Sequence, residues 1–589
     1  MRKIDLTIEI CGSSGDGTLA AGDILAMTLS HLGYHTLSFD VYPAEIRGFG
    51  KCVAHTRVSD APLYSVGRGV DVLVSLNDPY SIEQAPSLKE RAVVLFDSWP
   101  LKEVGEGECV AGHLKPGNYL YGVPMGELSQ RSTHGWRSRN IVALGALAGL
   151  FDMDVDGFLE RLTSKFKKKA GVAEQVAAAF KAGVDYVREN LLKIDPLSLA
   201  LDKKPEQKGY ALLSGNEAAA QGALDAKCRF YAGYPITPAT KIMEILSARL
   251  PREGGTVVQT EDEISAIGMV TGAAFMGKRA MTATSGPGLC LMSEFIGYNV
   301  MAENSVVILD GQRGGPATGL PTKTEQSDLM MAMFGTNGDA PRIVVAPTSV
   351  AECHYWVAEA FYLAEKYQVP VIVLSDLFLA TCKTNVILAK IDPKKLAANK
   401  VPTAEQMKDY RRQLVTDDGV SPRTIPGTVG GEFVVSGLEQ DEEGTPAYDA
   451  KTHTMMTEKR HRKMRTALEN DVPRPERFGC NGKASLGVLS WGSTMGAVVE
   501  AVERACEKGH KVAALKQVVL NPLHVEDLKA FCADCETLLV PELNYGGQFA
   551  NWLSMHVSAP MRRLCRVNTR PLSYQDVLEE IENISGDGK

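Results

Sequence analysis

Short apolar runs alternate with amphipathic segments along most of this chain. Apolar runs of strand length predict strands, and segments with apolar residues at helical spacing predict helices. In the first ~190 residues, strands are predicted at residues 6–11, 35–40, 70–75 and 92–97. A turn is predicted at residues 12–17 and a helix at residues 18–32. Because strands alternate with helices, we expect an α/β domain with a parallel sheet that is covered on both faces.

The alternation is interrupted twice, which predicts the domain organisation. Polar residues at 202–209 are typical of an interdomain linker. A second α/β rhythm follows, and it fails over a long stretch rich in Lys, Pro and Gly before a third one begins. We predict a first α/β domain at residues 1–195, a linker at 196–210 and a second domain at 211–382. An extended insertion at 383–480 and a third domain at 481–589 follow.

A basic run lies inside the predicted insertion. Residues 459–465 hold three arginines, two lysines and one histidine around Met464. Such a run usually forms the solvated face of a helix, and this is the interpretation we favour. Contact with an acidic partner or ligand is the alternative.

Composition excludes several classes of protein. The 589 residues are 44% hydrophobic and 23% charged, with a net charge of −8, which argues against a nucleic-acid binder. No apolar run reaches the ~20 residues of a membrane span, and the N-terminus lacks a secretory signal. We therefore expect a cytoplasmic protein without membrane contact.

Cysteine usage gives no sign of a metal centre. The twelve cysteines are scattered, and residues 532–535 form the only Cys-x-x-Cys motif. A zinc ribbon needs a second pair, and an iron–sulfur cluster needs a multi-cysteine set. We expect reduced or buried thiols and no metal site on this chain.

Three consecutive carboxylates mark the first candidate site. An apolar run at residues 256–260 leads into Glu261, Asp262 and Glu263, and a segment rich in Ala and Gly follows. Carboxylates at a strand-to-helix junction lie where open α/β sheets bind ligands. The alternative is an acidic helix N-terminus that is stabilised by the helix dipole alone.

The segment from Tyr234 to Thr240 is the second candidate. Its two prolines favour an extended turn, Thr237 suits an N-cap, and Pro238 suits the first helical position. A helix start of this kind offers N–H groups and a hydroxyl to a carboxylate ligand. The alternative is a helix cap with no ligand.

Two glycine-rich turns complete the set. In residues 282–288, Ser285 and Gly286 follow a predicted strand, and glycine lets the backbone approach a ligand closely. In residues 310–322, Arg313 offers a two-pronged donor for a carboxylate. An ordinary turn and a surface arginine are the respective alternatives.

Taken together and in this order, the four segments resemble the α subunit of the 2-oxoacid:ferredoxin oxidoreductases. Residues 12–17 and 42–48 resemble the family's γ domain, and residues 491–494 and 542–548 resemble its transketolase C-terminal-like domain. The resemblance implies a multidomain α/β fold. In it, a γ-type domain precedes a pyrimidine-binding thiamine diphosphate domain, and a transketolase C-terminal-like domain follows.

The resemblance also implies roles for single residues. Glu263 matches the glutamate that activates the aminopyrimidine of thiamine diphosphate, with Glu261 as the second choice. Thr237, Arg313 and Thr322 match positions that hold the substrate carboxylate. The positions implied to line the cofactor, besides Glu263, are Tyr234, Pro235, Ile236, Ser285 and Gly286.

Part of the cofactor machinery has no counterpart in this sequence. Neither Gly-Asp-Gly string, at residues 15–17 and 586–588, is followed by the paired asparagines that hold Mg²⁺ and diphosphate. We therefore expect the diphosphate site, Mg²⁺ and a [4Fe-4S] cluster on a separate β subunit. The implied partners are this subunit, in a dimer of heterodimers (a heterotetramer), and ferredoxin, with CoA as co-substrate.

The motif sequences resemble the 2-oxoglutarate branch of the family more than the pyruvate branch. The resemblance therefore favours 2-oxoglutarate as the substrate, converted reversibly to succinyl-CoA. A second substrate carboxylate needs a second cation, for which Arg423 or a β-subunit lysine is a candidate. Pyruvate or another 2-oxoacid is the alternative. Two other classes stay open: a non-catalytic scaffold subunit, and an NAD-dependent dehydrogenase based on the glycines of residues 12–17 with Asp40.

Overall fold

The computed structural model describes residues 4–42, 50–99, 110–167, 171–201 and 209–586. The chain divides into two compact units. Residues 1–213 and 382–387 form the first unit, and residues 214–381 and 388–589 form the second. Within the described ranges, no helix is long and apolar enough to cross a membrane. Residues 202–208 of the predicted linker, residues 43–48 of the motif at 42–48 and residues 587–588 of the string at 586–588 lie outside the described residues, and the predicted domain boundaries stay predictions.

The first unit is built on a mixed sheet. In sheet order its described strands are β6 (Tyr119–Val123), β5 (Leu88–Asp97), β4 (Val70–Ser75), β1 (Asp5–Ser13), β3 (Lys51–Ser59), β2 (His35–Val41), β14 (Lys383–Val386) and β7 (Ala211–Ser214). The strands β1, β4, β5 and β6 are parallel, whereas β3 is antiparallel to both β1 and β2.

The prediction of an all-parallel first sheet is therefore wrong for one half of it. Only nine residues separate β2 from β3, whereas a parallel crossover needs about a dozen residues or more. The strand β14, from the start of the predicted insertion, pairs with β2 and extends the sheet. Apolar periodicity reports burial, not strand direction, so neither feature is visible in the pattern.

Helices cover both faces of this first sheet. Val72 and Val74 point into one apolar core and Leu73 into the other, as alternation along a strand requires. The larger core is closed by α1 (Thr18–Leu32), α4 (Arg139–Leu150), α5 (Val155–Ser164) and α6 (Val172–Asn190), and the smaller one by α2 (Asp78–Gln84). The unit also contains α3 (Met125–Thr133).

A seven-stranded sheet forms the centre of the second unit. Its order is β18 (Val519–Asn521), β12 (Ile343–Val345), β13 (Val371–Asp376), β11 (Val307–Gln312), β10 (Ala280–Thr284), β8 (Phe230–Gly233) and β9 (Thr256–Gln259). All strands but β18 run parallel, so their carboxyl ends lie along one edge. This edge is where an open α/β sheet binds ligands.

Eight helices accompany this sheet in the described part of the second unit. Most of them connect its strands or begin near its carboxyl edge. They are α7 (Gly215–Asp225), α8 (Thr240–Arg249), α9 (Glu263–Phe275), α10 (Gly286–Leu291), α11 (Ser293–Met301), α12 (Leu329–Phe334), α13 (Val350–Tyr367) and α14 (Leu377–Thr381).

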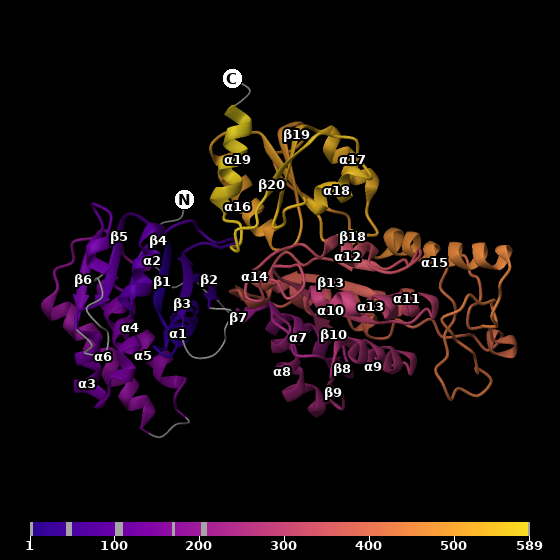
Figure 1. Cartoon of the computed structure of the whole chain (residues 1–589), viewed down its shortest axis with the longest axis horizontal. Coiled ribbons are helices and arrows are strands. Elements are labelled where there is room, and N and C mark those ends of the chain that lie inside the picture. Colours follow the sequence, from indigo (N-terminus) through magenta and orange to yellow (C-terminus); the bar gives the residue numbers. More distant parts are fainter. Residues whose placement is uncertain (1–3, 43–49, 100–109, 168–170, 202–208, 587–589) are drawn as a thin grey trace. The chain divides into compact units, whose positions relative to one another are not determined.

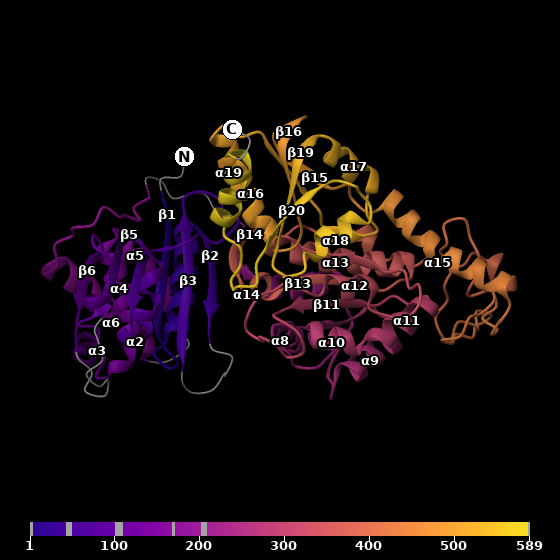
Figure 2. The same ribbon diagram turned by 45° about the horizontal axis from the view of Figure 1, so that its top comes forward.

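The last part of the chain forms a second, smaller sheet. Its order is β15 (Glu476–Gly479), β17 (Val512–Lys516), β16 (Ala484–Ser490), β19 (Cys535–Glu542) and β20 (Met561–Cys565). Figures 1 and 2 show α16 (Thr494–Glu507) and α19 (Tyr574–Gly586) on one face of this sheet. On the other face lie α17 (Val525–Ala533) and α18 (Gln548–Ser554), and their core is continuous with that of the seven-stranded sheet.

In the sequence between the strands of these two sheets, residues 388–449 run mostly as irregular chain into the long helix α15 (Ala450–Asn470), and Figure 2 shows this segment reaching away from both sheets. The prediction that residues 459–465 form a solvated helix face is wrong for Lys459, Arg460 and Lys463, which are buried, whereas His461 and Arg465 are exposed. Lys459 is 0% exposed and Lys463 is 1% exposed in their side chains, and both form ion pairs with Glu303. The acidic partner lies in the same chain.

Candidate active site

The four motif segments meet at one edge of the seven-stranded sheet. They follow β8, β9, β10 and β11, which are neighbours in the order β11-β10-β8-β9. Because these strands are parallel, residues 234–240, 261–263, 285–288 and 313–322 all leave the sheet at its carboxyl edge. The structure thus brings together the segments that the sequence singled out.

The three consecutive carboxylates have three different environments. Glu261 is exposed. Asp262 is the N-cap of α9, and its side chain accepts a hydrogen bond from the Ser265 backbone N–H at 2.8 Å. This bond and the Ser265 hydroxyl lower the pKa of Asp262. Glu263 begins the helix and is only 6% exposed, so it is the carboxylate of the three that is held inside the protein.

Glu263 lies against the turn after β10. A Cβ on Gly288 would come within 2.7 Å of Glu263 Oε1 and 2.0 Å of Thr284 Oγ1, so only glycine leaves room for this carboxylate. Among the residues that the structure describes, only its own backbone N–H donates to it. Burial and the neighbouring Asp262 raise the pKa of Glu263, against the lowering effect of Arg313. The carboxylate is buried and available to a ligand.

The proline turn differs from its prediction. The helix α8 begins at Thr240 with Ala239 as N-cap, and no side chain caps it. Thr237 is therefore not the cap, and Pro238 is not the first helical residue. The Thr240 N–H donates to the Ile236 carbonyl, so residues 236–240 form a separate turn before the helix. The side chain of Asn216, which the sequence analysis missed, holds this turn by donating to the Pro238 carbonyl at 2.9 Å.

Arg313 is part of the site and not a surface arginine. It is 6% exposed, and its Nη1 donates to the Thr237 carbonyl at 2.8 Å. Its Nε has no acceptor within the described part of the chain. Burial lowers the pKa of this guanidinium, while Asp328, Glu263 and Asp310 raise it. The guanidinium thus lies between Glu263 and the two aspartates, and its Nε–H can still donate to a ligand.

The loop that carries Arg313 is closed on itself. The Gly314 N–H donates to the Lys323 carbonyl at 2.9 Å, which brings the neighbours of Arg313 and Thr322 together. A Cβ on Gly319, whose φ is +50°, would come within 2.1 Å of the Gly314 carbonyl oxygen. Residues 315–320 at the tip are exposed, whereas Thr322 is partly buried. Backbone closure therefore places Thr322 close to Arg313.

Gln326 anchors the end of this loop to the smaller sheet, and sequence reasoning missed it. Its backbone and side chain exchange hydrogen bonds with the backbone of Leu543, and its side-chain amide also donates to the Trp491 carbonyl. Asn544 donates to the Gln326 carbonyl at 2.9 Å. The only signal was the string of residues 323–326, because its partners lie more than 160 residues away.

Arg423, the candidate for a second substrate cation, does not face this site. Its guanidinium donates to the carbonyls of Ala274 and Phe275, at the last turn of α9, and to Asn304 Oδ1. Glu263 begins the same thirteen-residue helix, so the two ends are roughly 18 Å apart. Arg423 fixes the insertion to the helix end.

The site suits an aminopyrimidine ring better than a metal ion. In the described ranges, no group of three or more His, Cys, Asp or Glu side chains is placed to hold a metal. A buried carboxyl group without an outside donor suits an aminopyrimidine: when protonated it donates to a ring nitrogen, and when ionised it accepts from that nitrogen once the nitrogen carries the proton. Ser285 Oγ, also buried and without a partner in the described chain, supplies a further polar atom.

Two family models match the chain. The model described as pyruvate flavodoxin/ferredoxin oxidoreductase, thiamine diphosphate-binding, matches residues 221–459. The model described as pyruvate ferredoxin/flavodoxin oxidoreductase matches residues 7–186. The four motif segments lie within the first match.

Individual proteins are similar over nearly the whole chain. Subunit alpha of 2-oxoacid:ferredoxin oxidoreductase 2 from Aeropyrum pernix is 30% identical over 100% of this chain and 98% of its own. The 2-oxoglutarate oxidoreductase subunit KorA of Mycobacterium tuberculosis is 32% identical over 92% of this chain and 86% of its own.

The structure of 2-oxoglutarate:ferredoxin oxidoreductase from Magnetococcus marinus, with 2-oxoglutarate, coenzyme A and succinyl-CoA bound, matches with a TM-score of 0.92. It is 35% identical over 99% of this chain and 100% of that chain. These similarities confirm the predicted multidomain α/β fold class. The chain belongs to the 2-oxoacid:ferredoxin oxidoreductase family, as one of its alpha subunits.

Proposed function

We propose that this chain is the alpha subunit of a 2-oxoglutarate:ferredoxin oxidoreductase that shares a thiamine diphosphate site with a β subunit. The reaction takes 2-oxoglutarate and CoA to succinyl-CoA and CO₂, and two electrons pass to ferredoxin. The observation that carries the proposal is the buried, available carboxylate of Glu263 beside the buried cation of Arg313. The KorA relatives and the Magnetococcus marinus structure support 2-oxoglutarate as the substrate.

In this proposal, each residue has one task. Glu263 would hydrogen-bond a ring nitrogen of the pyrimidine and exchange with it the proton that activates the cofactor. The cofactor, when bound, supplies the electron sink for decarboxylation. The ring is lined by Tyr234, Pro235, Ile236, Ser285 and Gly286, all at the carboxyl edge.

Arg313, with Thr237 and Thr322, binds the 2-oxo carboxylate of the substrate. A guanidinium with free N–H groups is a strong, oriented partner for a carboxylate. The cation for the distal carboxylate comes from the β subunit, since Arg423 is bonded at the far end of α9. The β subunit also carries the diphosphate site, Mg²⁺ and the [4Fe-4S] cluster in the proposed dimer of heterodimers, which works with ferredoxin and CoA.

The test uses the complex of this chain with its β subunit. Viologen reduction is measured with CoA and, in turn, 2-oxoglutarate, pyruvate and a branched-chain 2-oxoacid. We expect 2-oxoglutarate to give the highest kcat/KM. We expect Glu263→Ala to lower kcat by about 10²- to 10⁴-fold, whereas Glu261→Ala, which removes an exposed carboxylate two residues away, keeps wild-type turnover.

Two results would contradict the proposal. Near wild-type turnover of Glu263→Ala would remove the glutamate from the chemistry and favour the scaffold alternative. A preference for pyruvate would leave the chemistry in place and overturn the substrate assignment.

A further inference from the structure

Two aspartates meet at the base of the loop that carries Arg313. Asp310 lies in β11 and is 0% exposed. Asp328 precedes α12 and does not cap it with its side chain. Asp310 pairs with Thr284 across the sheet and the Asp328 N–H donates to Gln312 Oε1, so the two carboxyl groups lie beside each other, and each acts on the pKa of the other. The turn after β10 leaves room for them, because a Cβ on Gly286 would come within 2.6 Å of Asp328 Oδ2.

No ordinary donor serves these oxygens. Across the described residues, no N–H or O–H group reaches Asp310 Oδ1, Asp310 Oδ2 or Asp328 Oδ2. Two ionised carboxylates cannot hydrogen-bond each other, and two buried like charges in contact repel strongly. One of the two groups must therefore carry a proton.

The titration behaviour agrees with this geometry. Burial and the charge of Asp328 raise the pKa of Asp310 well above its usual range. Burial raises the pKa of Asp328 to about 6, although its interaction with Asp310 opposes this. The directions make Asp310 the proton donor of the pair and Asp328 the acceptor.

The charged and titratable groups around the pair come from several elements. Arg313 lowers the pKa of both aspartates, and Glu325 raises that of Asp328. The Cys290 thiol, in α10, faces both carboxyl groups. Arg313 also faces Glu263 in α9. The guanidinium thus lies between the proposed activating glutamate and the acid pair.

We propose that Asp310 and Asp328 share one proton and act as positioning residues that set the charge behind Arg313. With one negative charge, the pair orients the guanidinium and leaves it cationic enough to bind a 2-oxoacid carboxylate. With two, it competes with the substrate for the same cation. This inference rests on the proposed substrate-binding role of Arg313.

The first test detects the proton without substrate. Infrared spectra of the complex at neutral pH should contain the carbonyl band of a protonated carboxylic acid. Asp310→Asn, whose amide can donate the same hydrogen bond but cannot ionise, should lose this band. Glu263→Gln, the control at the neighbouring buried carboxylate, should keep it. Because other buried carboxyl groups such as Asp40 also have a raised pKa, the wild-type minus Asp310→Asn difference spectrum decides: a difference spectrum without the band overturns the shared proton. Asp328→Asn provides a second variant if Asp310→Asn fails to fold.

The second test addresses positioning. As the pair loses its proton above neutral pH, KM for 2-oxoglutarate should rise in the wild type by up to about tenfold per pH unit. In Asp310→Asn, KM should stay within about twofold over the same range. Glu325→Gln should keep the wild-type pH dependence, because it removes a nearby charge and leaves the pair. A flat wild-type KM, or an equal rise in Asp310→Asn, overturns the positioning role.

Failure of the proposed function looks different. If Arg313→Met leaves KM for 2-oxoglutarate unchanged, then the substrate-binding role of Arg313 is wrong. The infrared band would still decide whether the aspartates share a proton.

Discussion

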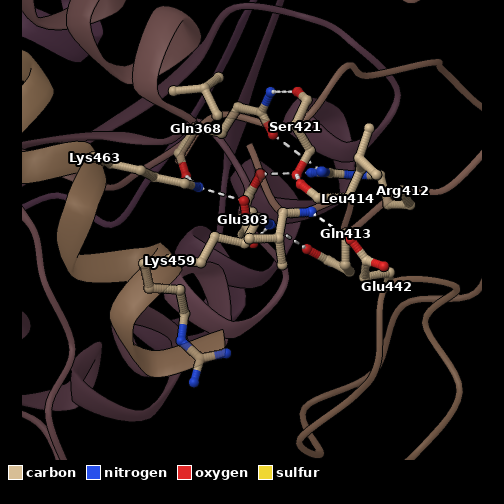
Figure 3. A network of polar contacts seen from close by, with 12 residues as sticks. Glu303, Gln368, Arg412, Gln413, Leu414, Ser421, Glu442, Lys459 and Lys463 are labelled. Atoms are coloured by element: carbon tan, nitrogen blue, oxygen red, sulfur yellow. Dashed lines mark hydrogen bonds and ion pairs between the residues drawn. The ribbon is translucent and has the colours of Figure 1, made fainter. Parts of the chain in front are cut away.

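Two buried groups of charged side chains in the second unit differ in how their charges are satisfied. Around Glu303, Lys459 and Lys463 bind the carboxylate directly (Figure 3). At the carboxyl edge of the sheet, no other residue in the described part of the chain donates to Glu263, and Asp310 is paired there only with Asp328. The ion pairs of Glu303 stabilise the fold. The carboxyl groups at the sheet edge are left able to bind a ligand, which costs stability, as is common at functional sites.

The Glu303 group holds more positive than negative charge, and the backbone compensates. Arg412 donates to the carbonyls of Ala302 and Glu303, at the carboxyl end of α11. Lys463 also donates to the carbonyl of Gln368, at the end of α13. Helix C-termini carry partial negative charge and stabilise cations. The insertion is therefore fixed to two helix ends, through Arg412 and through Lys463 of the basic run.

Breaking the satisfied group should give the largest effect on stability. Glu303→Ala leaves two lysines buried without their carboxylate, and we expect the free energy of unfolding to fall by about 3–5 kcal/mol. Urea denaturation followed by circular dichroism measures this change. Glu458→Ala, at an exposed glutamate next to Lys459, is the matched control and should change stability by less than about 0.5 kcal/mol. A loss below about 1 kcal/mol for Glu303→Ala would mean that the ion pairs are not what holds the insertion.

This contact also shows where sequence reasoning ends. Periodicity gave helix α1 as residues 18–32 and placed four motif segments at strand ends, because those signals are local. Glu303 and Lys459 are 156 residues apart, and nothing local distinguishes a buried lysine from a solvated one. The same holds for Gln326 with Trp491, and for Asp310 with Asp328.

Errors at the site itself were of a different kind. Thr237 and Pro238 have the composition of a helix start, yet the helix begins at Thr240 because the turn of residues 236–240 comes first. Glu263 was selected over Glu261 by resemblance, and burial now gives an independent reason for the choice. The alternative of an NAD-dependent dehydrogenase gains no support, since the family is that of ferredoxin-linked oxidoreductases.

The stabilities conferred by Glu303 and by Asp310 should respond to pH with opposite signs. Although burial opposes it, Lys459, Lys463 and Arg412 lower the pKa of Glu303 far below its usual value of 4.5. Its stabilisation is therefore present above about pH 4.5 and is lost as the pH falls below it, by up to about 1.4 kcal/mol per pH unit. Asp310 has the opposite sign. Its raised pKa means that the folded state keeps a proton that the unfolded chain releases above about pH 4. Stability is then lost as the pH rises.

Unfolding free energies from pH 3 to pH 8 check both signs in one series. Glu303→Gln should flatten the acid side of the curve, and Asp310→Asn should remove part of the decline above about pH 4. Equal curves for the wild type and Asp310→Asn would contradict the assignment of a raised pKa to this pair. If the wild type and Glu303→Gln lose stability equally as the pH falls, the lowered pKa of Glu303 is contradicted.

The smallest expected effect is the most informative about the site. Glu263→Gln keeps the size of the side chain and removes a buried charge to which no other described residue donates. We expect it to raise the free energy of unfolding by about 0.5–1 kcal/mol at neutral pH while it lowers turnover. Glu261→Gln, at an exposed position, should leave both unchanged. Thermal and urea unfolding of the variants decide the matter. If Glu263→Gln is destabilised, then Glu263 stabilises the fold as Glu303 does, and the contrast between the two groups is removed.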